Sequence, residues 1–204
     1  IQEKYEYIAC IGSGAYSEVW HAIDKSTCRV VAIKVLKQAH TCKAVMRLVH
    51  REVRMLQTAN HPNLVKLLSA FQSRSGRVHL VFERMETSIM DEVEANPEGL
   101  PYAILKAAVW QLLRAVAHLH ERNIMHRDIK PANLLLDGNG VVKLCDFGFA
   151  RHVGGRGEHT PYIVTRWYRA PEILAGSEYG PSSDVWSIAC TIAEMATGTP
   201  LFPG

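Results

Sequence analysis

Three short blocks of residues, in a fixed order, constrain this chain more than any other feature of its sequence. They are HRDIKPAN at residues 126–133, DFG at residues 146–148 and APE at residues 170–172. Each block alone has an ordinary interpretation as a polar turn or as the exit from a strand. Three such blocks in one chain of 204 residues, with VAIK upstream at residues 31–34, are specific. We therefore interpret them as parts of one site.

The composition excludes several classes of protein. Hydrophobic residues make up 48% of the chain and charged residues 21%, which is the balance of a soluble globular domain. The net charge of +3 is too small to predict a nucleic-acid partner or a membrane surface, and we expect neither. The five cysteines are scattered, with no Cys-x-x-Cys pair. They favour an intracellular location, cytoplasmic and/or nuclear, over a disulfide framework or a zinc site.

Hydrophobic periodicity divides the chain into a strand-rich first part and a helix-rich second part. Strands are predicted over residues 5–11, 19–23, 29–36, 65–71 and 78–82, and a helix over residues 43–57. Helical spacing then runs from Pro101 to Leu119. A last helix opens at Ser182 and is closed by Gly198; it is apolar nearly all round, which is typical of a buried helix. The expected hinge lies near residues 83–86.

Two features of the first part indicate a nucleotide site. Gly12 and Gly14 lie in a loop between two predicted strands, where backbone N–H groups can come close to phosphate oxygens. Lys34 ends an apolar strand, and Glu52 falls within the apolar stripe of the following helix. Because an isolated buried carboxylate is costly, we expect Glu52 to pair with Lys34. Taken alone, the glycines fit any hairpin turn, and Lys34 fits an ordinary lysine at a strand edge.

Together these motifs resemble eukaryotic protein kinases, and the resemblance runs from Tyr5 to Gly204. It implies an α+β fold of two lobes. The N-lobe, residues 1–83, would be an antiparallel sheet with one helix, and the C-lobe, residues 84–204, would be mainly helical. Since the family has further helices at its C-terminal end, we expect residues 1–204 to be a partial kinase domain with an incomplete C-lobe.

Further segments place the resemblance within one group of kinases. TRWYRAPE at residues 165–172 is similar to the cyclin-dependent and MAP kinases, the CMGC group. The closest resemblance, to the cyclin-dependent-kinase-like family, rests on REVRML at 51–56, HLVFE at 79–83 and CDFGFAR at 145–151. That family has Thr-x-Tyr in its activation loop, and Thr160 and Tyr162 stand at that place here.

The resemblance assigns catalytic roles to four residues. Asp128 would accept the proton of the substrate hydroxyl, and Lys130 would contact the γ-phosphate of ATP, as in serine/threonine-specific kinases. Lys34, held by Glu52, would contact the α- and β-phosphates. Asp184 would brace the catalytic loop from below, although a charge in the first turn of a helix is its simpler interpretation.

The resemblance also implies ATP and Mg²⁺ as ligands. Asn133 and Asp146 would hold the metal ions that bridge the phosphates. The residues implied in ATP binding come from several strands and are Ile11, Gly12, Gly14, Val19, Ala32, Lys34, Phe82, Glu83, Met85 and Leu135.

A phosphorylation switch is expected around Thr160 and Tyr162, set by an upstream kinase or by autophosphorylation. Phosphorylated Thr160 would attract three arginines from separate elements, and phosphorylated Tyr162 two more. Each arginine alone fits a solvated surface charge. The arginines expected at Thr160 are Arg51, Arg127 and Arg151, and those expected at Tyr162 are Arg166 and Arg169.

The resemblance implies protein substrates with proline or a small residue after the phosphorylated residue. In this group the carbonyl at Val164 turns away and is engaged by Arg169, so an ordinary N–H would lack an acceptor there. A cyclin partner is not expected, because the Glu52 helix lacks the usual cyclin-contact motif.

Two alternatives remain open at this stage. One is a MAP-kinase-type enzyme, and the other is a catalytically weak kinase-fold fragment that acts as a scaffold. Against the scaffold, none of Lys34, Asp128 and Asp146 is replaced. Ala132 stands where the family usually has Glu or Gln, which affects the expected peptide preference more than catalysis.

Overall fold

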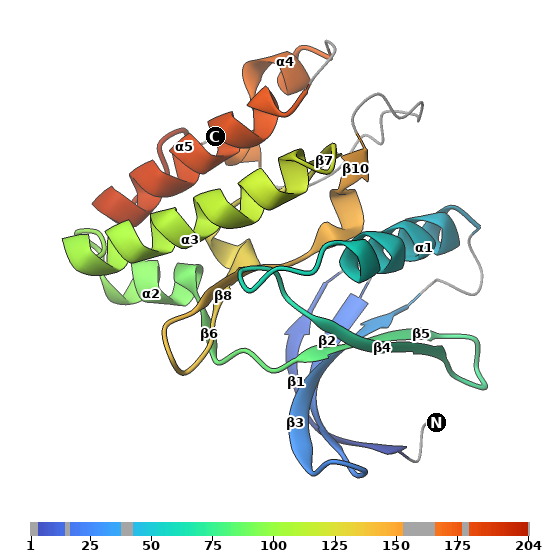
Figure 1. Cartoon of the computed structure of the whole chain (residues 1–204). Coiled ribbons are helices and arrows are strands. Elements are labelled where there is room, and N and C mark those ends of the chain that lie inside the picture. The colour runs from blue at the N-terminus through green and yellow to red at the C-terminus, as the bar shows by residue number, and fades with distance from the viewer. Residues whose placement is uncertain (1–3, 15–16, 38–42, 153–165, 177–179, 204) are drawn as a thin grey trace. The chain divides into compact units, whose positions relative to one another are not determined.

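The computed structural model describes residues 4–14, 17–37, 43–152, 166–176 and 180–203 (Figure 1). Side chains are described except at residues 43–45, 47–48, 51–52, 149 and 151–152. The chain forms two compact units. The first consists of Ile1–Asn60 with Val65–Met85, and the second of His61–Leu64 with Glu86–Gly204. The sequence predicts a boundary after residue 83, whereas the structure divides after Met85 and gives His61–Leu64 to the second unit.

The first unit is built on an antiparallel sheet of five strands in the order β1-β2-β3-β5-β4 (Figure 1). Its elements are β1 (Tyr5–Ser13), β2 (Ser17–Asp24), β3 (Arg29–Leu36), helix α1 (Lys43–Thr58), β4 (Leu67–Gln72) and β5 (Val78–Glu83). All six were predicted from the sequence. Short runs of β-branched and aromatic residues, separated by turn residues, were sufficient to find the strands.

The two faces of this sheet carry separate apolar clusters because side chains alternate along each strand. Val31, Ile33 and Val35 of β3 enter a cluster on one face and are at most 5% exposed. Leu36 and Leu80 belong to the other cluster, which includes Val49 of helix α1. Leu80 is fully buried there. Burial of this apolar face attaches α1 to the sheet.

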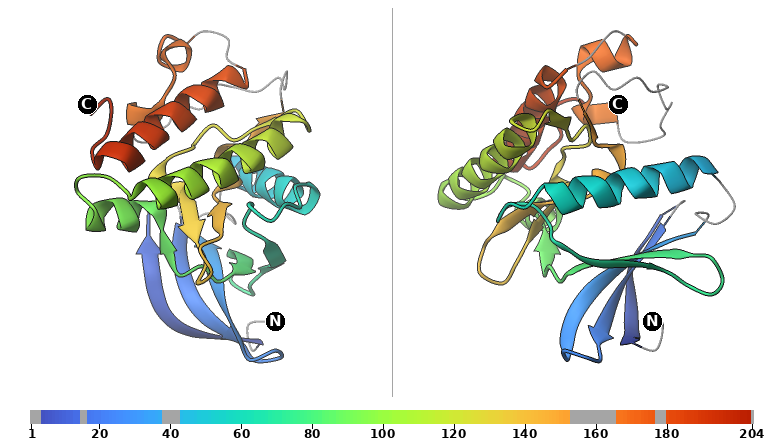
Figure 2. Two further views of the ribbon diagram at one scale, coloured as in Figure 1. Left: turned by 60° about the vertical axis from the view of Figure 1, so that its left-hand side comes forward. Right: turned by 45° about the vertical axis from the view of Figure 1, so that its right-hand side comes forward.

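The second unit is mainly helical, and Figure 2 shows its two long helices, α3 and α5, packed side by side. Its helices are α2 (Ile89–Ala95), α3 (Tyr102–His120), α4 (Pro171–Leu174) and α5 (Ser182–Thr197). Its short strands are β6 (Thr87–Ser88), β8 (Leu134–Leu136) and β9 (Val142–Leu144), which form one sheet, and β7 (Ile124–Met125) with β10 (Arg151–His152). Three 3-10 turns complete it: η2 (Pro131–Asn133), η3 (Phe147–Phe149) and η4 (Arg166–Tyr168). The predicted α+β fold is confirmed.

Within the part of the chain that the structure describes, no helix combines the length and the apolar character needed to cross a membrane.

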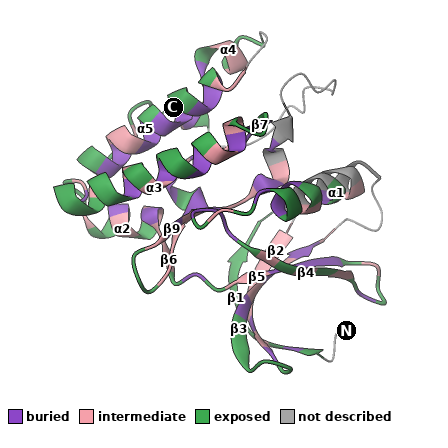
Figure 3. Cartoon of the chain, in the orientation of Figure 1, coloured by how far each residue is buried: buried purple, intermediate pink, exposed green. Residues whose placement is uncertain are grey.

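Helix α5 differs from its prediction. Its apolar composition predicted burial all round, but the helix has exposed as well as buried positions (Figure 3). Val185 is 58% exposed and Trp186 is 37% exposed. Trp186 instead stacks on Phe202, with ring centroids 5.8 Å apart. The buried face is largely polar and carries Ser183, Asp184, Ser187, Thr191 and Glu194. These groups are buried because each makes hydrogen bonds inside the second unit, which offsets the loss of water.

The segment His61–Leu64 is held in the second unit by the buried side chain of Asn63. The Asn63 amide nitrogen donates to Gln111 Oε1 at 2.8 Å and to the carbonyl of Val142 at 2.9 Å. The Asn63 carbonyl accepts from the N–H of Leu144 at 2.9 Å. These bonds join the segment to α3 and β9. They explain why it belongs to the second unit, although the residues on either side of it belong to the first.

The cluster between the sheet and α1 gives a first prediction. Leu80→Ala should lower the free energy of unfolding by about 2–5 kcal/mol, because it leaves a cavity in a closed core. Leu68→Ala, on the neighbouring strand β4 at a site 49% exposed, should change it by no more than about 0.5 kcal/mol. Urea denaturation of both variants is the measurement. Equal losses would contradict the assignment of Leu80 to the core.

Candidate active site

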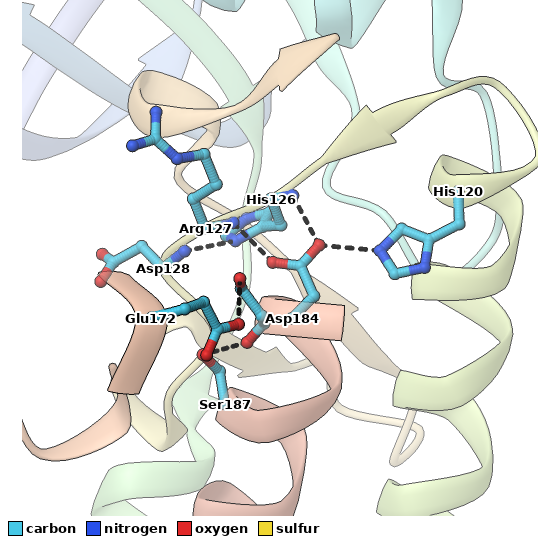
Figure 4. Close-up of polar contacts among 8 residues, drawn as sticks. His120, His126, Arg127, Asp128, Glu172, Asp184 and Ser187 are labelled. Carbon is cyan, nitrogen blue, oxygen red and sulfur yellow. Dashed lines mark hydrogen bonds and ion pairs between the residues drawn. The ribbon is translucent and has the colours of Figure 1, made fainter. Parts of the chain in front are cut away.

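The loop that contains Asp128 is fixed by the carboxylate of Asp184 at the start of helix α5. Asp184 Oδ2 accepts from the N–H of His126 at 2.9 Å, and Oδ1 accepts from the N–H of Arg127 at 2.8 Å. His120 Nε2 of helix α3 lies 2.8 Å from Oδ2 (Figure 4). The expectation that Asp184 braces this loop is confirmed.

The Asp184 carboxylate is 1% exposed, yet it is stabilised in its charged form. Burial alone would raise the pKa of this carboxyl group. The hydrogen bond from His120, the nearby His126 and the N–H groups of Arg127 and His126 outweigh burial and lower the pKa overall. The same bonds hold Arg127 at φ 72°, a left-handed conformation that non-glycine residues rarely adopt.

His126 connects this loop to the segment that carries Asp146. Its ring is fully buried, and Nδ1 accepts from the N–H of Asp128 at 3.3 Å. Nε2 lies 2.9 Å from the carbonyl of Cys145, which can only accept, so Nε2 carries a proton and donates it there. The ring also meets Phe147 edge to face, with centroids 5.1 Å apart. One histidine ring thus bonds the backbone at Asp128 and the backbone at Cys145, directly before Asp146.

The structure brings three predicted site residues together: Asp128, Lys130 and Asn133. Lys130 Nζ lies 3.0 Å from Asp128 Oδ2. Asn133 Nδ2 donates to the same oxygen at 2.8 Å and to the Asp128 carbonyl at 2.7 Å. The carboxylate is therefore oriented by an ammonium and an amide, and it is paired with one positive charge. This arrangement can hold a hydroxyl group for proton removal and can neutralise a phosphate beside it.

The Asn133 amide is oriented by Asp128. Both of its N–H donors are directed at Asp128, which leaves Oδ1 as its available oxygen. The carbonyl of Asn133 accepts from the N–H of Cys145 at 3.0 Å, and Asp146 is the next residue in the chain. Among described residues, no three His, Cys, Asp or Glu side chains form a metal-binding group. That Asn133 and Asp146 hold Mg²⁺ stays a prediction; two oxygen ligands would suit this ion, which takes its other ligands from phosphates and water.

In the first unit, several residues predicted to contact ATP lie in one row across the sheet. Gly12 pairs with Val19, and Val19 pairs with Lys34 on the next strand. Ala32, two residues before Lys34 on β3, pairs with Phe82 of β5. The sheet register therefore gathers the glycine loop and the lysine, although they are far apart in sequence.

The glycines of this loop are not required by the fold itself. A Cβ atom added at Gly12 would come no closer than 3.8 Å to Val19, and one at Gly14 no closer than 3.8 Å to the Ser17 carbonyl. Neither glycine has a positive φ. A side chain would therefore fit at either position, and the close approach of a ligand phosphate to this backbone stays a prediction. Lys37, which the sequence reading missed, binds the loop through its ammonium, at 3.1 Å from the Gly14 carbonyl.

The other predicted ATP-binding residues have the following places. Ile11 lies on β1 and is 51% exposed. Glu83 ends β5, where its N–H donates to the Lys66 carbonyl and its carboxylate accepts from the Lys66 N–H. Met85 follows and is buried, and Leu135 lies on β8 of the second unit, half-buried. Their contacts with a nucleotide stay predictions.

The predicted switch is only partly described. Thr160, Tyr162 and Val164 lie outside the described residues, as do the side chains of the phosphate-binding candidates Arg51 and Arg151 and of Glu52. Arg166 is exposed at the start of η4, and Arg169 is half-buried, with its N–H donating to the Arg166 carbonyl at 3.0 Å. The Lys34–Glu52 pair and the convergence of arginines on Thr160, Arg127 among them, therefore stay predictions.

Sequence reasoning missed the contacts that fix the segment after the switch. Tyr168 donates its hydroxyl to Glu194 Oε2 at 2.6 Å, and its carbonyl accepts from Ser187 Oγ at 2.7 Å. Burial raises the pKa of the Tyr168 phenol, and the Glu194 carboxylate raises it further. Burial also raises the pKa of Glu194, against the effect of the tyrosine hydroxyl. Glu172 accepts from Ser183 Oγ at 2.8 Å (Figure 4). Helix α5 therefore holds this segment at both Tyr168 and Glu172.

The role of Asp184 can be tested by Asp184→Asn. The amide keeps one oxygen acceptor but replaces the other oxygen with an NH₂ group, so at least one buried donor loses its partner, at a cost of about 1–3 kcal/mol for each. Because the fold lowers the pKa of Asp184, the stability that it adds is fully present above the unfolded value of about 3.9 and is lost as the pH falls. The stability difference from wild type should therefore be constant between pH 5 and about pH 4 and shrink as the pH falls further to 3.

The measurement for Asp184→Asn is thermal and urea unfolding across this pH range. Glu121→Gln removes a carboxylate from the same unit whose side chain is 73% exposed, and it should leave both stability and its pH dependence nearly unchanged. A pH-independent difference for Asp184→Asn would mean that its charge does not matter.

Comparison with known sequences adds independent information. The profile of the protein kinase domain matches residues 5–204. The chain is 45% identical over 203 residues to cyclin-dependent kinase-like 4 of Mus musculus. It is 45% identical over 204 residues to cyclin-dependent kinase-like 2 of Homo sapiens, and 43% identical over 206 residues to cyclin-dependent kinase-like 5 of Homo sapiens. The resemblance inferred from the motifs is confirmed.

The matches cover nearly all of this chain but only part of each relative. In the same order they cover 99%, 99% and 100% of the chain, and 59%, 41% and 21% of the relatives.

Proposed function

The chain belongs to the protein kinase domain family, and we propose that it acts as a serine/threonine kinase that transfers the γ-phosphoryl group of ATP to protein hydroxyls. Membership of this family implies the use of ATP and Mg²⁺. The observation that carries the proposal is the cluster of Asp128, Lys130 and Asn133, with its carboxylate held 3.0 Å from an ammonium and 2.8 Å from an amide.

The proposed mechanism assigns one step to each of these residues. Asp128 accepts the hydroxyl proton of the substrate and orients its oxygen toward the γ-phosphorus. Lys130 offsets charge on the transferred group from the same side, which suits a serine or threonine hydroxyl. Asn133 and Asp146 would hold Mg²⁺, which would neutralise charge on the phosphates. Most of the acceleration comes from positioning and charge neutralisation.

Two alternatives have less support. A kinase-fold scaffold usually lacks one of Lys34, Asp128 or Asp146, and all three are present here. A MAP-kinase-type enzyme shares the activation-loop pattern, but the relatives compared above are cyclin-dependent-kinase-like proteins. We also propose an intracellular location, and a kinase that works without a cyclin.

The central test is Asp128→Asn in the full-length protein. Removing the base should lower kcat for peptide phosphorylation by at least about 100-fold, as expected for loss of a general base. Asp137→Asn is a matched control, because Asp137 caps a turn through the N–H groups of Asn139 and Val141, contacts that an asparagine oxygen can keep. Radiolabelled phosphate transfer gives the rates, and Mg²⁺-dependent ATP binding shows whether the variant is folded. Near-normal turnover by Asp128→Asn would overturn the proposal.

We further propose that phosphorylation of Thr160 activates the enzyme, with a contribution from Tyr162. A phosphate carries a charge of about −1.5 to −2 and can accept charge-assisted hydrogen bonds from several arginines. Arg127 is a suitable partner, because its backbone is already fixed by Asp184 next to Asp128. The phosphate would then connect the base loop to the activation loop.

Thr160→Ala should lower kcat/KM by at least about tenfold relative to the phosphorylated enzyme, since the arginines lose their common anion. Steady-state kinetics with protein of known phosphorylation state is the measurement. Ser75→Ala, in a turn of the first unit, controls for loss of a hydroxyl group elsewhere. If unphosphorylated wild type and Thr160→Ala were as fast as the phosphorylated enzyme, the switch would not exist.

The preferred substrates should carry proline or a small residue directly after the phosphorylated one. The reason is that a buried N–H without an acceptor costs about 1–3 kcal/mol, which proline avoids. A peptide library varied at this position should show a preference of about tenfold or more for proline over leucine or arginine, as that penalty implies. Equal rates for bulky residues would contradict the proposal.

A further inference from the structure

Two histidines meet where the segment His61–Leu64 rests on helix α3. The rings of His61 and His118 lie with centroids 4.8 Å apart, tilted by 41°. His61 belongs to the second unit but follows helix α1 of the first unit by only a few residues. His118 lies in the last turn of α3. Neither histidine has a part in the proposed catalytic site.

The geometry requires an unprotonated nitrogen on His61. Its Nδ1 accepts a hydrogen bond from the N–H of Asn63 at 3.1 Å. Protonation would place a hydrogen on Nδ1 and turn two donors toward each other. The Asn63 N–H would then lose its acceptor, at the residue whose side chain fixes the segment to Gln111 and Val142.

The geometry also favours a neutral His118. Its Nε2 is buried and has no hydrogen-bond partner within the described part of the chain. A lone pair is tolerated at such a position far better than an N–H, because a buried donor without an acceptor carries its full desolvation cost. Protonation of His118 must put a hydrogen on this nitrogen, so it would create that unsatisfied donor.

The surrounding charges act in the same direction. Arg114 of α3 and Arg122, just after it, face the pair, and Glu121 is the acidic group beside them. Burial first, and then His118, Arg114 and Arg122, lower the pKa of His61. Burial and Arg122 lower the pKa of His118, against a smaller opposite effect of Glu121. The same arginines, and the use of His61 Nδ1 as an acceptor, make the pair unsuitable for a divalent cation.

We propose that the His61–His118 pair is a proton-sensitive contact that holds the segment His61–Leu64 on the second unit at neutral pH and weakens its hold under mildly acidic conditions. If the chain is a kinase as proposed, weakening this contact lowers its kinase activity on acidification, because the segment directly follows the helix that carries Glu52.

The direction of the effect follows from linkage. The anchored segment prefers both rings neutral, whereas the released rings titrate near the ordinary histidine value of about 6.5. Stability from the contact is therefore complete above that pH and declines below it. At pH 5.5, one unit lower, each histidine can weaken the anchor by at most about tenfold.

Hydrogen exchange of three amides tests the proposal without using activity. The N–H groups of Asn63, Leu64 and Leu144 bond to His61 Nδ1, the His61 carbonyl and the Asn63 carbonyl. After correction for intrinsic exchange, their protection in wild type should fall between pH 7.5 and pH 5.5 by about threefold to tenfold for each histidine that titrates. In His118→Phe, which keeps an aromatic ring, the fall should be smaller.

A control and a second measurement keep the test decisive. His50→Phe, at an exposed site on α1, should respond to pH as wild type does. Histidine-ring NMR of wild type should show His61 and His118 titrating below about 6.5, the ordinary value. The His61 midpoint should rise in His118→Phe, because a neighbouring positive charge is removed.

Equal protection at both pH values, or ordinary titration of both rings, would overturn the proposal. Failure of the kinase assays with these exchange and NMR results intact would instead count against the proposed function alone.

Discussion

The arrangement of the second unit depends on one buried carboxylate. Asp184 is 1% exposed and satisfies three donors, two of them backbone N–H groups of consecutive residues. An unpaired charge in such a place would be strongly destabilising, so the loop must present those donors. Presenting them requires Arg127 to adopt φ 72°. The turn that results directs Asp128 toward Lys130 and Asn133, and the candidate chemistry follows from that direction.

Helix α5 carries out this bracing with a face that a soluble helix would normally expose. Its buried side includes Asp184, Ser187 and Glu194, each bonded to a different part of the unit. Buried polar groups add little net stability compared with apolar packing, but each one accepts only a narrow range of geometries. The helix therefore specifies where the catalytic loop and the segment near Tyr168 lie, while hydrophobic clusters elsewhere supply most of the stability.

The sequence was sufficient for features with a local signal. The strand over Arg29–Leu36 was predicted with its observed bounds, because apolar residues and turns mark it directly. Helix α2 was missed, since it has seven residues and only Ile89 and Val93 are buried; its local signal was the capping box of Ser88. In the candidate site, Asp128, Lys130 and Asn133 were found by motif. The bond from Tyr168 to Glu194 was not, because no sequence rule joins residues 26 positions apart.

The place of His61–Leu64 also determines how the two units are joined. The chain passes from one unit to the other after Asn60, after Leu64 and again after Met85, so three covalent connections join them. Neither unit is a continuous stretch of sequence. A cut at a single peptide bond would therefore leave both units tied through another passage. The sheet unit, expressed alone as residues 1–85, would carry Asn63 without Gln111 and Val142, and its buried amide would lose both partners. Each unit is thus compact in space, but no single cut in the sequence separates one unit from the other.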